Sequence, residues 1–160
     1  MSKLIDVKIL NPFFTSSFEV ISEMAEGAKV TKGKLSLTDS SKFKSKGLAV
    51  IIGVTGVIEG RVILDMPISV AVKLASLMNF EEITKSNELV RSSLGELGNM
   101  ISGKAVSRLM EQGYQLNITP PSVFEGEGVT VSDTFSQQNI QAPLILDFGV
   151  IDVNLALRFV

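Results

Sequence analysis

The chain has 160 residues, a hydrophobic fraction of 45% and a formal net charge of −2. This length and hydrophobicity are typical of one folded domain, so we expect a single domain over residues 1–160. The sequence contains neither cysteine nor histidine, which excludes disulfides, thiolate nucleophiles, metals ligated by those residues and a Ser-His-Asp triad. Any chemistry must use carboxylates, amides, hydroxyls, amines or groups that a partner brings.

The charge pattern argues against nucleic-acid and membrane partners. Five lysines occur over residues 32–46, but they are spread around a predicted turn, which favours a solvated hairpin over a nucleic-acid patch. The longest apolar run, residues 48–54, is too short to cross a bilayer, which takes ~20 residues. The first residues lack the sustained apolar core of a signal peptide. A cytoplasmic protein is therefore expected.

The first half of the chain predicts one helix followed by three strands. Periodicity and turn residues place a helix at residues 6–25, a strand at 28–38, a turn at 39–46 and strands at 48–54 and 57–65. The pair Asn11 and Pro12 is typical of a helix start, so the regular helix is expected to begin there. Residues 48–54 are apolar on both faces, which predicts an interior strand. Thr55 and Gly56 predict a two-residue hairpin turn.

The second half repeats this pattern with an additional helix. The predicted elements are a helix at 66–78 with Pro67 in its first turn, a linker at 79–87, a long helix at 88–113, a strand at 115–119, a loop or edge at 122–128, an irregular segment at 129–138 and a hairpin of strands 140–148 and 150–160 around Gly149. The chain is therefore expected to be an α+β protein with helices packed on a largely antiparallel sheet. Because each half holds a helix and then three strands, a pseudo-repeat is plausible.

Alternation along two strands predicts a polar face opposite the core. In residues 57–65, Glu59 and Arg61 lie on the face opposite the apolar side chains. In residues 150–160, Asp152, Asn154 and Arg158 are expected to point outward. The terminal strands are therefore expected to be half-exposed.

The long helix at 88–113 has two distinct sides. Its core stripe recurs at steps of three and four residues and comprises Val90, Leu94, Leu97, Ile101, Ala105 and Leu109. A rotation of ~100° per residue places Ser92, Glu96, Asn99 and Gly103 on the opposite side. That side is polar and sparsely charged, which favours docking against another molecule.

Three glycines inside this helix need a physical reason. Each of Gly95, Gly98 and Gly103 should cost ~1 kcal/mol relative to alanine. Close packing would offset the cost if Gly98 points toward the sheet, and Gly103 would open the exposed face to a partner. A bare E-x-x-N on a helix is a weak motif, since Glu96 and Asn99 are equally compatible with ordinary surface positions.

Several segments together resemble one protein family. The helix residues 94–103, LGELGNMISG, resemble the E-x-x-N helix of the CheC, CheX and FliY chemotaxis phosphatases. Residues 10–13, LNPF, residues 54–56, VTG, followed by Gly60, and residues 119–123, TPPSV, with Gly126 resemble CheX-type sequences in matching order. The resemblance covers nearly the whole chain and implies a CheC-like pseudo-repeat of a helix plus three strands.

The resemblance implies a phosphatase for the phosphoaspartate of a CheY-type response regulator. Glu96 would engage the active-site lysine of the regulator, and Asn99 would orient the attacking water. Ser92 and Gly103 would flank them in the partner-binding face. The protein would need no cofactor of its own, because Mg²⁺ comes with the regulator. CheX-type proteins are homodimers joined through sheet edges, which half-exposed terminal strands would permit.

The first helix departs from the CheC pattern. CheC-type members carry a second E-x-x-N there, whereas this chain has Glu19 followed by Ser22. The resemblance therefore implies one site per chain, as in CheX.

Two other interpretations remain open. The same helix face would serve a non-catalytic module that docks to a response regulator or another signalling partner. A structural or oligomerisation domain would use the glycines only for close helix packing. Asn99 distinguishes the phosphatase from the docking module, because a pure docking surface does not need a carboxamide one turn from Glu96.

Overall fold

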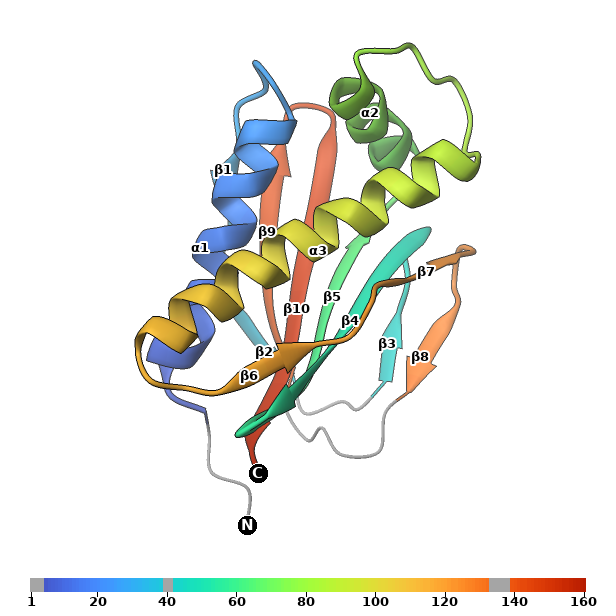
Figure 1. Cartoon of the computed structure of the whole chain (residues 1–160). Coiled ribbons are helices and arrows are strands. Elements are labelled where there is room, and N and C mark those ends of the chain that lie inside the picture. Colours follow the sequence, from blue (N-terminus) through green and yellow to red (C-terminus); the bar gives the residue numbers. More distant parts are fainter. Residues whose placement is uncertain (1–4, 39–41, 133–138) are drawn as a thin grey trace.

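A computed structural model describes residues 5–38, 42–132 and 139–160. In these ranges three helices, coloured blue, green and yellow-green to gold in Figure 1, cover one face of an antiparallel sheet. The helices are α1 (Val7–Met24), α2 (Ile68–Asn79) and α3 (Glu88–Glu111). The strands are β1 (Thr31–Lys32), β2 (Ser36–Thr38), β3 (Lys42–Lys44), β4 (Leu48–Gly56), β5 (Ile58–Met66), β6 (Leu116–Ile118), β7 (Ser122–Glu125), β8 (Thr130–Ser132), β9 (Asn139–Leu146) and β10 (Gly149–Phe159). The expected α+β fold is confirmed.

The sheet joins the two halves of the chain by exchanging their edge strands. Its order is β1-β9-β10-β5-β4-β6, with β2 also on β9 and β7 also on β4. The hairpins β4–β5 and β9–β10 meet at the centre, where β5 pairs with β10. The broken strand β1–β2 of the first half lies on the second hairpin, and β6–β7 of the second half lies on the first. Each half is thus completed by the other.

The beginning of the first helix differs from the prediction at Asn11 and Pro12. Helix α1 begins at Val7, because the Asp6 carboxylate caps it by accepting a hydrogen bond from the Lys8 amide at 3.0 Å. Pro12 lies inside the helix. Ile9 and Leu10, which precede it, are buried in the core. Burial of these side chains favours the additional helical residues despite the missing amide hydrogen of the proline.

The predicted turns are displaced by neighbouring strands. The prediction of a turn at Thr55 and Gly56 is wrong, because both residues belong to β4 and pair with β6. The bend lies at Val57 instead, between β4 and β5. Gly149 is the first residue of β10, and the turn precedes it. Pro67 is the N-cap of α2, just before its first turn. Of the predicted irregular segment 129–138, residues 130–132 form β8, and residues 133–138 lie outside the described ranges, as do residues 39–41.

The polar face of the sheet is largely buried, contrary to the prediction, although the Glu59 and Arg158 side chains remain partly exposed, at 35% and 39%. Arg61, Asp152 and Asn154 are at most 5% exposed. The small sheet β3–β8 packs on this face through Phe43 and Val131. Arg61 donates hydrogen bonds to Asn154 and Asn139 at 3.0 and 2.9 Å, so its charge is buried among acceptors. Strand β10 also lies between β9 and β5. The edges of the sheet are therefore β1–β2 and β6–β7, and the terminal strand is not one of them.

Asp65 on the same face gives a prediction about pH. Burial raises its pKa, while hydrogen bonds from the Ser45 hydroxyl (2.7 Å) and the Lys46 amide (3.0 Å) act in the opposite direction. Asp152, its cross-strand neighbour in β10, raises the pKa further, and the Lys46 charge lowers it. The Lys46 ammonium lies 2.6 Å from Asp152. A raised pKa means that the folded state binds the proton more tightly than the unfolded chain does.

The contribution of Asp65 to stability should therefore fall as pH rises from about 3.8, its ordinary pKa, through its higher folded pKa, and stay low above it. We expect the free energy of unfolding of the wild type, relative to Asp65→Asn, to increase when the pH is lowered from neutral toward that window. Urea denaturation of both proteins at several pH values measures the difference. A difference that does not change with pH, or that shrinks on acidification, would contradict the assignment.

Candidate active site

Helix α3 carries the candidate site and crosses the sheet diagonally in Figure 1. Its N-cap is Asn87, whose side-chain oxygen accepts a hydrogen bond from the Val90 amide at 2.9 Å. All members of the predicted core stripe have 0% exposure: Val90, Leu94, Leu97, Ile101, Ala105 and Leu109. The predicted orientation of the helix is therefore confirmed.

The opposite side of α3 brings the predicted site residues to the surface. Ser92 and Glu96 are exposed, and Asn99 and Gly103 are half-buried. A Cβ atom built on Gly103 would meet no atom within 4 Å, so this part of the face is open. Within the described residues, the side chains of Glu96 and Asn99 have no hydrogen-bond or ion-pair partner. Both groups are available to another molecule.

Gly98 allows α3 to lie close to the sheet. A Cβ atom at this position would lie 2.8 Å from Val50 Cγ1 and 3.0 Å from Ile52 Cδ1, both on β4. These distances are shorter than ordinary van der Waals contact, so a side chain would push the helix away from β4. The prediction that Gly98 faces the sheet is confirmed.

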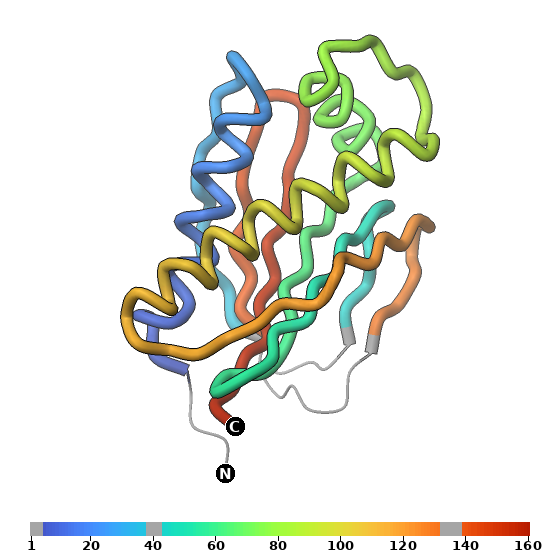
Figure 2. The backbone as a smooth tube through the Cα atoms, in the orientation of Figure 1, coloured from blue at the N-terminus to red at the C-terminus, as the bar shows by residue number. Residues whose placement is uncertain are grey.

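A shallow groove of about 400 Å³ runs beside Glu96. Helix residues Ser92, Gly95 and Glu96 line one side, and Pro121 and Val123 line the other. The second wall is the segment from β6 to β7. This segment pairs along β4 and lies below α3 in the view of Figure 2. No role for this wall was predicted from the sequence. The sequence feature that could have indicated it is the pair Pro120 and Pro121, because adjacent prolines interrupt the pairing of a strand at a defined position.

Thr119 holds the break in place. Its amide donates to the Gly53 carbonyl at 2.9 Å, and its hydroxyl accepts from the Gly53 amide at 2.8 Å. A Cβ on Gly53 would come within 2.9 Å of the Thr119 methyl group. The glycine thus permits the close approach that positions the groove wall.

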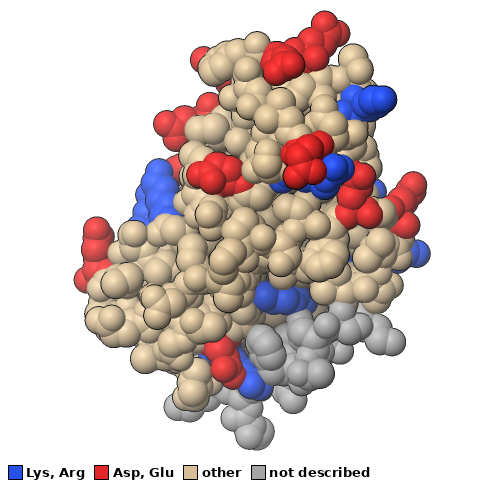
Figure 3. All heavy atoms as spheres, turned by 45° about the vertical axis from the view of Figure 1, so that its right-hand side comes forward, with Lys and Arg blue, Asp and Glu red and all other residues tan. Residues whose placement is uncertain are grey.

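Charged residues gather at one end of the groove. Arg91 lies 3.3 Å from Glu88 and 3.8 Å from Glu125, and the Ser86 hydroxyl donates a hydrogen bond to Glu125. Figure 3 shows charged side chains over the upper part of this side of the molecule, while its middle is largely free of them. Exposed ion pairs contribute little stability, but they already satisfy Glu88 and Glu125. Among the described residues, Glu96 is therefore the carboxylate of the groove that has no ion-pair partner.

The first helix does not offer a second site of the same kind. The Glu19 carboxylate accepts from Lys104 at 2.9 Å and from Arg108 at 2.6 Å, both on α3. These hydrogen bonds, from Lys104 first and Arg108 second, lower the pKa of Glu19. Ile21 is fully buried. Glu19 therefore serves the packing of α1 against α3, which agrees with one site per chain.

Comparison with known proteins places this arrangement in a family. Residues 48–144 match the family model described as chemotaxis phosphatase CheX. The chain is also 34% identical over 127 residues to the CheY-P phosphatase CheX of Thermotoga maritima, covering 79% of this chain and 81% of that protein. The chain belongs to the CheX family. The resemblance inferred from the sequence is thereby confirmed.

Solved structures of the CheX family agree over nearly the whole length. The CheX structure from Desulfovibrio desulfuricans has a TM-score of 0.83 at 28% identity, covering 94% of this chain and 99% of that one. A CheX–CheY–BeF3–Mg²⁺ complex from Borrelia burgdorferi has a TM-score of 0.82 at 33% identity, covering 97% and 99%. No helix among the described residues is both long and apolar enough to cross a membrane.

Proposed function

We propose that this chain is a phosphatase that accelerates hydrolysis of the phosphoaspartate of a CheY-type response regulator. Membership of the CheX family and the CheY-P phosphatase activity named for the Thermotoga relative support this function. The observation that carries the proposal is the pair Glu96 and Asn99 on one side of α3, where neither side chain has a partner among the described residues and Glu96 lines a groove. The Borrelia relative forms a complex with CheY, which supports a response regulator as the partner of this chain.

Asn99 is proposed to orient the attacking water. Phosphoryl transfer requires little covalent chemistry from the protein and depends on positioning and charge stabilisation. A carboxamide can accept one hydrogen bond from a water and donate another to a nearby oxygen. It can therefore hold a water in line with the phosphorus without acting as a base.

Glu96 is proposed to bind the active-site lysine of the regulator. Its carboxylate is exposed and has no cation partner among the described residues, so no ion pair must be broken before docking. Residues three apart on a helix lie on the same surface. Glu96 therefore reaches the regulator from the same side as Asn99, with Ser92 and Gly103 contacting the regulator at either end.

The metal is proposed to belong to the regulator. The docking face offers one carboxylate and one amide, which is a poor donor set for Mg²⁺ compared with a cluster of carboxylates. Mg²⁺ is present in the Borrelia complex with CheY. It would neutralise charge on the phosphoryl oxygens while this chain supplies Glu96 and Asn99.

We further propose one catalytic domain over residues 1–160, acting in the cytoplasm as a homodimer. The edges β1–β2 and β6–β7 are the parts of the described sheet that a second copy could extend. Because β6–β7 forms the groove wall, the β1–β2 edge would leave the docking surface free.

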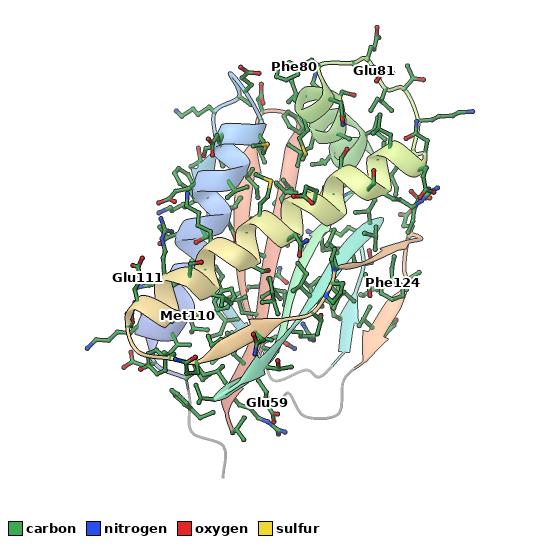
Figure 4. The ribbon with its side chains drawn as sticks, in the orientation of Figure 1. Glu59, Phe80, Glu81, Met110, Glu111 and Phe124 are labelled. Carbon is green, nitrogen blue, oxygen red and sulfur yellow. The ribbon has the colours of Figure 1, made fainter. Side chains whose placement is uncertain are left out.

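Glu96→Ala should weaken regulator binding and slow dephosphorylation together. Loss of one partner of a charge pair at an interface should raise the Kd for the phosphorylated regulator by about 30-fold, equivalent to about 2 kcal/mol. The measurement is the decay of an acyl-phosphorylated CheY-type regulator with Mg²⁺ at a series of regulator concentrations. Glu111→Ala is the matched control, because Glu111 is an exposed carboxylate at the far end of α3 (Figure 4). Equal effects of the two substitutions would remove Glu96 from the proposed role.

The same assay tests the proposed function as a whole. Faster decay with the wild type than with the regulator alone supports the phosphatase. If the wild type binds the phosphorylated regulator but leaves its decay unchanged, the domain is a non-catalytic reader of the phosphorylated state.

A further inference from the structure

Phe80, immediately after α2, has an unusual combination of properties. The residue is 83% exposed, and its side chain lies at the surface at the end of α2 (Figure 4). Its backbone has φ 52° and ψ 38°, and it is the one non-glycine residue with positive φ among the described residues. This left-handed position at a helix C-terminus is usually filled by glycine, sometimes by asparagine.

Folding gives no reason for phenylalanine at this position. The helix cap needs only the Phe80 amide, which donates to the Ser76 carbonyl. Glycine would supply the same amide without the steric cost of a Cβ atom in the left-handed region. Because the ring is exposed, its packing contributes little stability to offset that steric cost. A strained residue with an exposed apolar side chain therefore suggests a role in binding.

The loop that carries Phe80 is held firmly. Ser76 Oγ accepts from the Ile83 amide at 3.1 Å, and the Ser76 carbonyl accepts from the Glu81 amide at 3.2 Å. Asn79 donates to the Ser93 hydroxyl at 2.8 Å, which ties the loop to α3. A loop fixed in this way presents Phe80 in one geometry, so little ordering entropy would be lost on binding.

Beside Phe80 lies a hollow of about 660 Å³ with an acidic rim. Its apolar lining includes Leu77 and Ile83, and its rim carries three carboxylates from Glu26, Glu81 and Glu82 against one cation from Lys73. The difference, three minus one, leaves a local charge of −2. None of the three carboxylates has an ion-pair partner in the described ranges. Figure 3 shows acidic side chains predominating at this upper end of the molecule.

We infer that this surface, formed by Glu26, Leu77, Phe80, Glu81, Glu82 and Ile83 and termed the Phe80 patch, docks a basic segment of another protein. Lysine or arginine side chains of that segment pair with the unpaired carboxylates, and an apolar side chain packs against Phe80 and enters the hollow. The negative rim repels nucleic acid and anionic lipid. The patch does not share a lining residue with the groove beside Glu96. It is therefore a second interaction surface, separate from the proposed phosphatase site.

The first test uses short fluorescein-labelled peptides. The probe is an amphipathic helix of leucine and lysine; one control peptide has serine for leucine, and another has glutamate for lysine. Fluorescence anisotropy should show binding of the leucine–lysine peptide and of neither control peptide. The affinity should fall by about tenfold or more in Phe80→Gly, and by a similar factor in the double variant Glu81→Gln, Glu82→Gln. Phe124→Ser is the matched control, because Phe124 is 46% exposed on β7 and should leave the affinity unchanged.

The second test separates docking from folding. Phe80→Gly should raise the melting temperature by roughly 2–4 °C, because glycine relieves the left-handed strain, while regulator dephosphorylation keeps its rate and KM. Equal peptide affinity for wild type and Phe80→Gly would overturn the inference. Equal binding of the serine control peptide would also overturn the inference, because it would show that the peptide binds through general electrostatic attraction alone. An increased KM for the regulator in Phe80→Gly would assign the patch to the regulator interface and also overturn it. Failure of the phosphatase assay alone would leave these peptide results unaffected.

Discussion

Asn99→Ala should lower the rate constant for regulator dephosphorylation by about 100- to 1000-fold, while the affinity for the phosphorylated regulator stays close to that of the wild type. Removal of one well-placed orienting group commonly costs about 2.7–4 kcal/mol of barrier. Asn99 forms no side-chain hydrogen bond within the described residues. Its loss should therefore affect the bound transition state and leave the fold intact.

Single-turnover decay of the acyl-phosphorylated regulator at saturating and subsaturating enzyme separates rate from affinity. Asn99→Gln is informative, because it keeps the carboxamide but displaces it by one methylene group, so it should also be slow. Gln112→Ala is the control, since Gln112 is an exposed amide at the C-cap of α3. A loss confined to affinity would reassign Asn99 to docking. A large fall in melting temperature would contradict its position outside the core.

Gly98→Val should destabilise the protein by about 3 kcal/mol, the upper part of the range for overpacking a core. The added Cβ would lie 2.8 Å from Val50, a β-branched residue on β4 that has few alternative rotamers. The neighbouring contact to the end of the Ile52 side chain is easier to relieve, but both residues are 1% exposed and enclosed. The gain in helix propensity over glycine, less than ~1 kcal/mol, does not offset this clash.

Urea denaturation measures the effect, and Gly103→Ala on the same helix is its control. A Cβ on Gly103 meets nothing within 4 Å, so alanine should stabilise the helix by up to ~1 kcal/mol. The two substitutions should thus change the free energy of unfolding in opposite directions. If Gly98→Val left stability unchanged, α3 would not lie as close to β4 as the structure has it. The same variant that destabilises the fold should also slow dephosphorylation, since it lifts Glu96 and Asn99 away from the groove wall.

The sequence alone determined the helix that carries the candidate site. The stripe from Val90 to Leu109 repeats with the helical period, so its burial, the exposure of Glu96 and the half-buried position of Asn99 on the opposite side follow from local geometry. The two candidate residues lie on one helix, and their common orientation needs no information about the rest of the fold. The packing of Gly98 on the sheet was also predictable, because a costly glycine inside a helix is favoured where backbones approach closely.

Contacts between distant segments were decided only by the tertiary structure. Pro121 and Val123 reach the groove because β7 pairs with β4, a pairing that leaves no periodic trace in either segment. Asp152 matches the alternation of an exposed polar face, yet β3–β8 and the Lys46 ammonium enclose that face. Alternation records which side of a strand a residue occupies, but whether that side meets solvent depends on what the remote chain places over it.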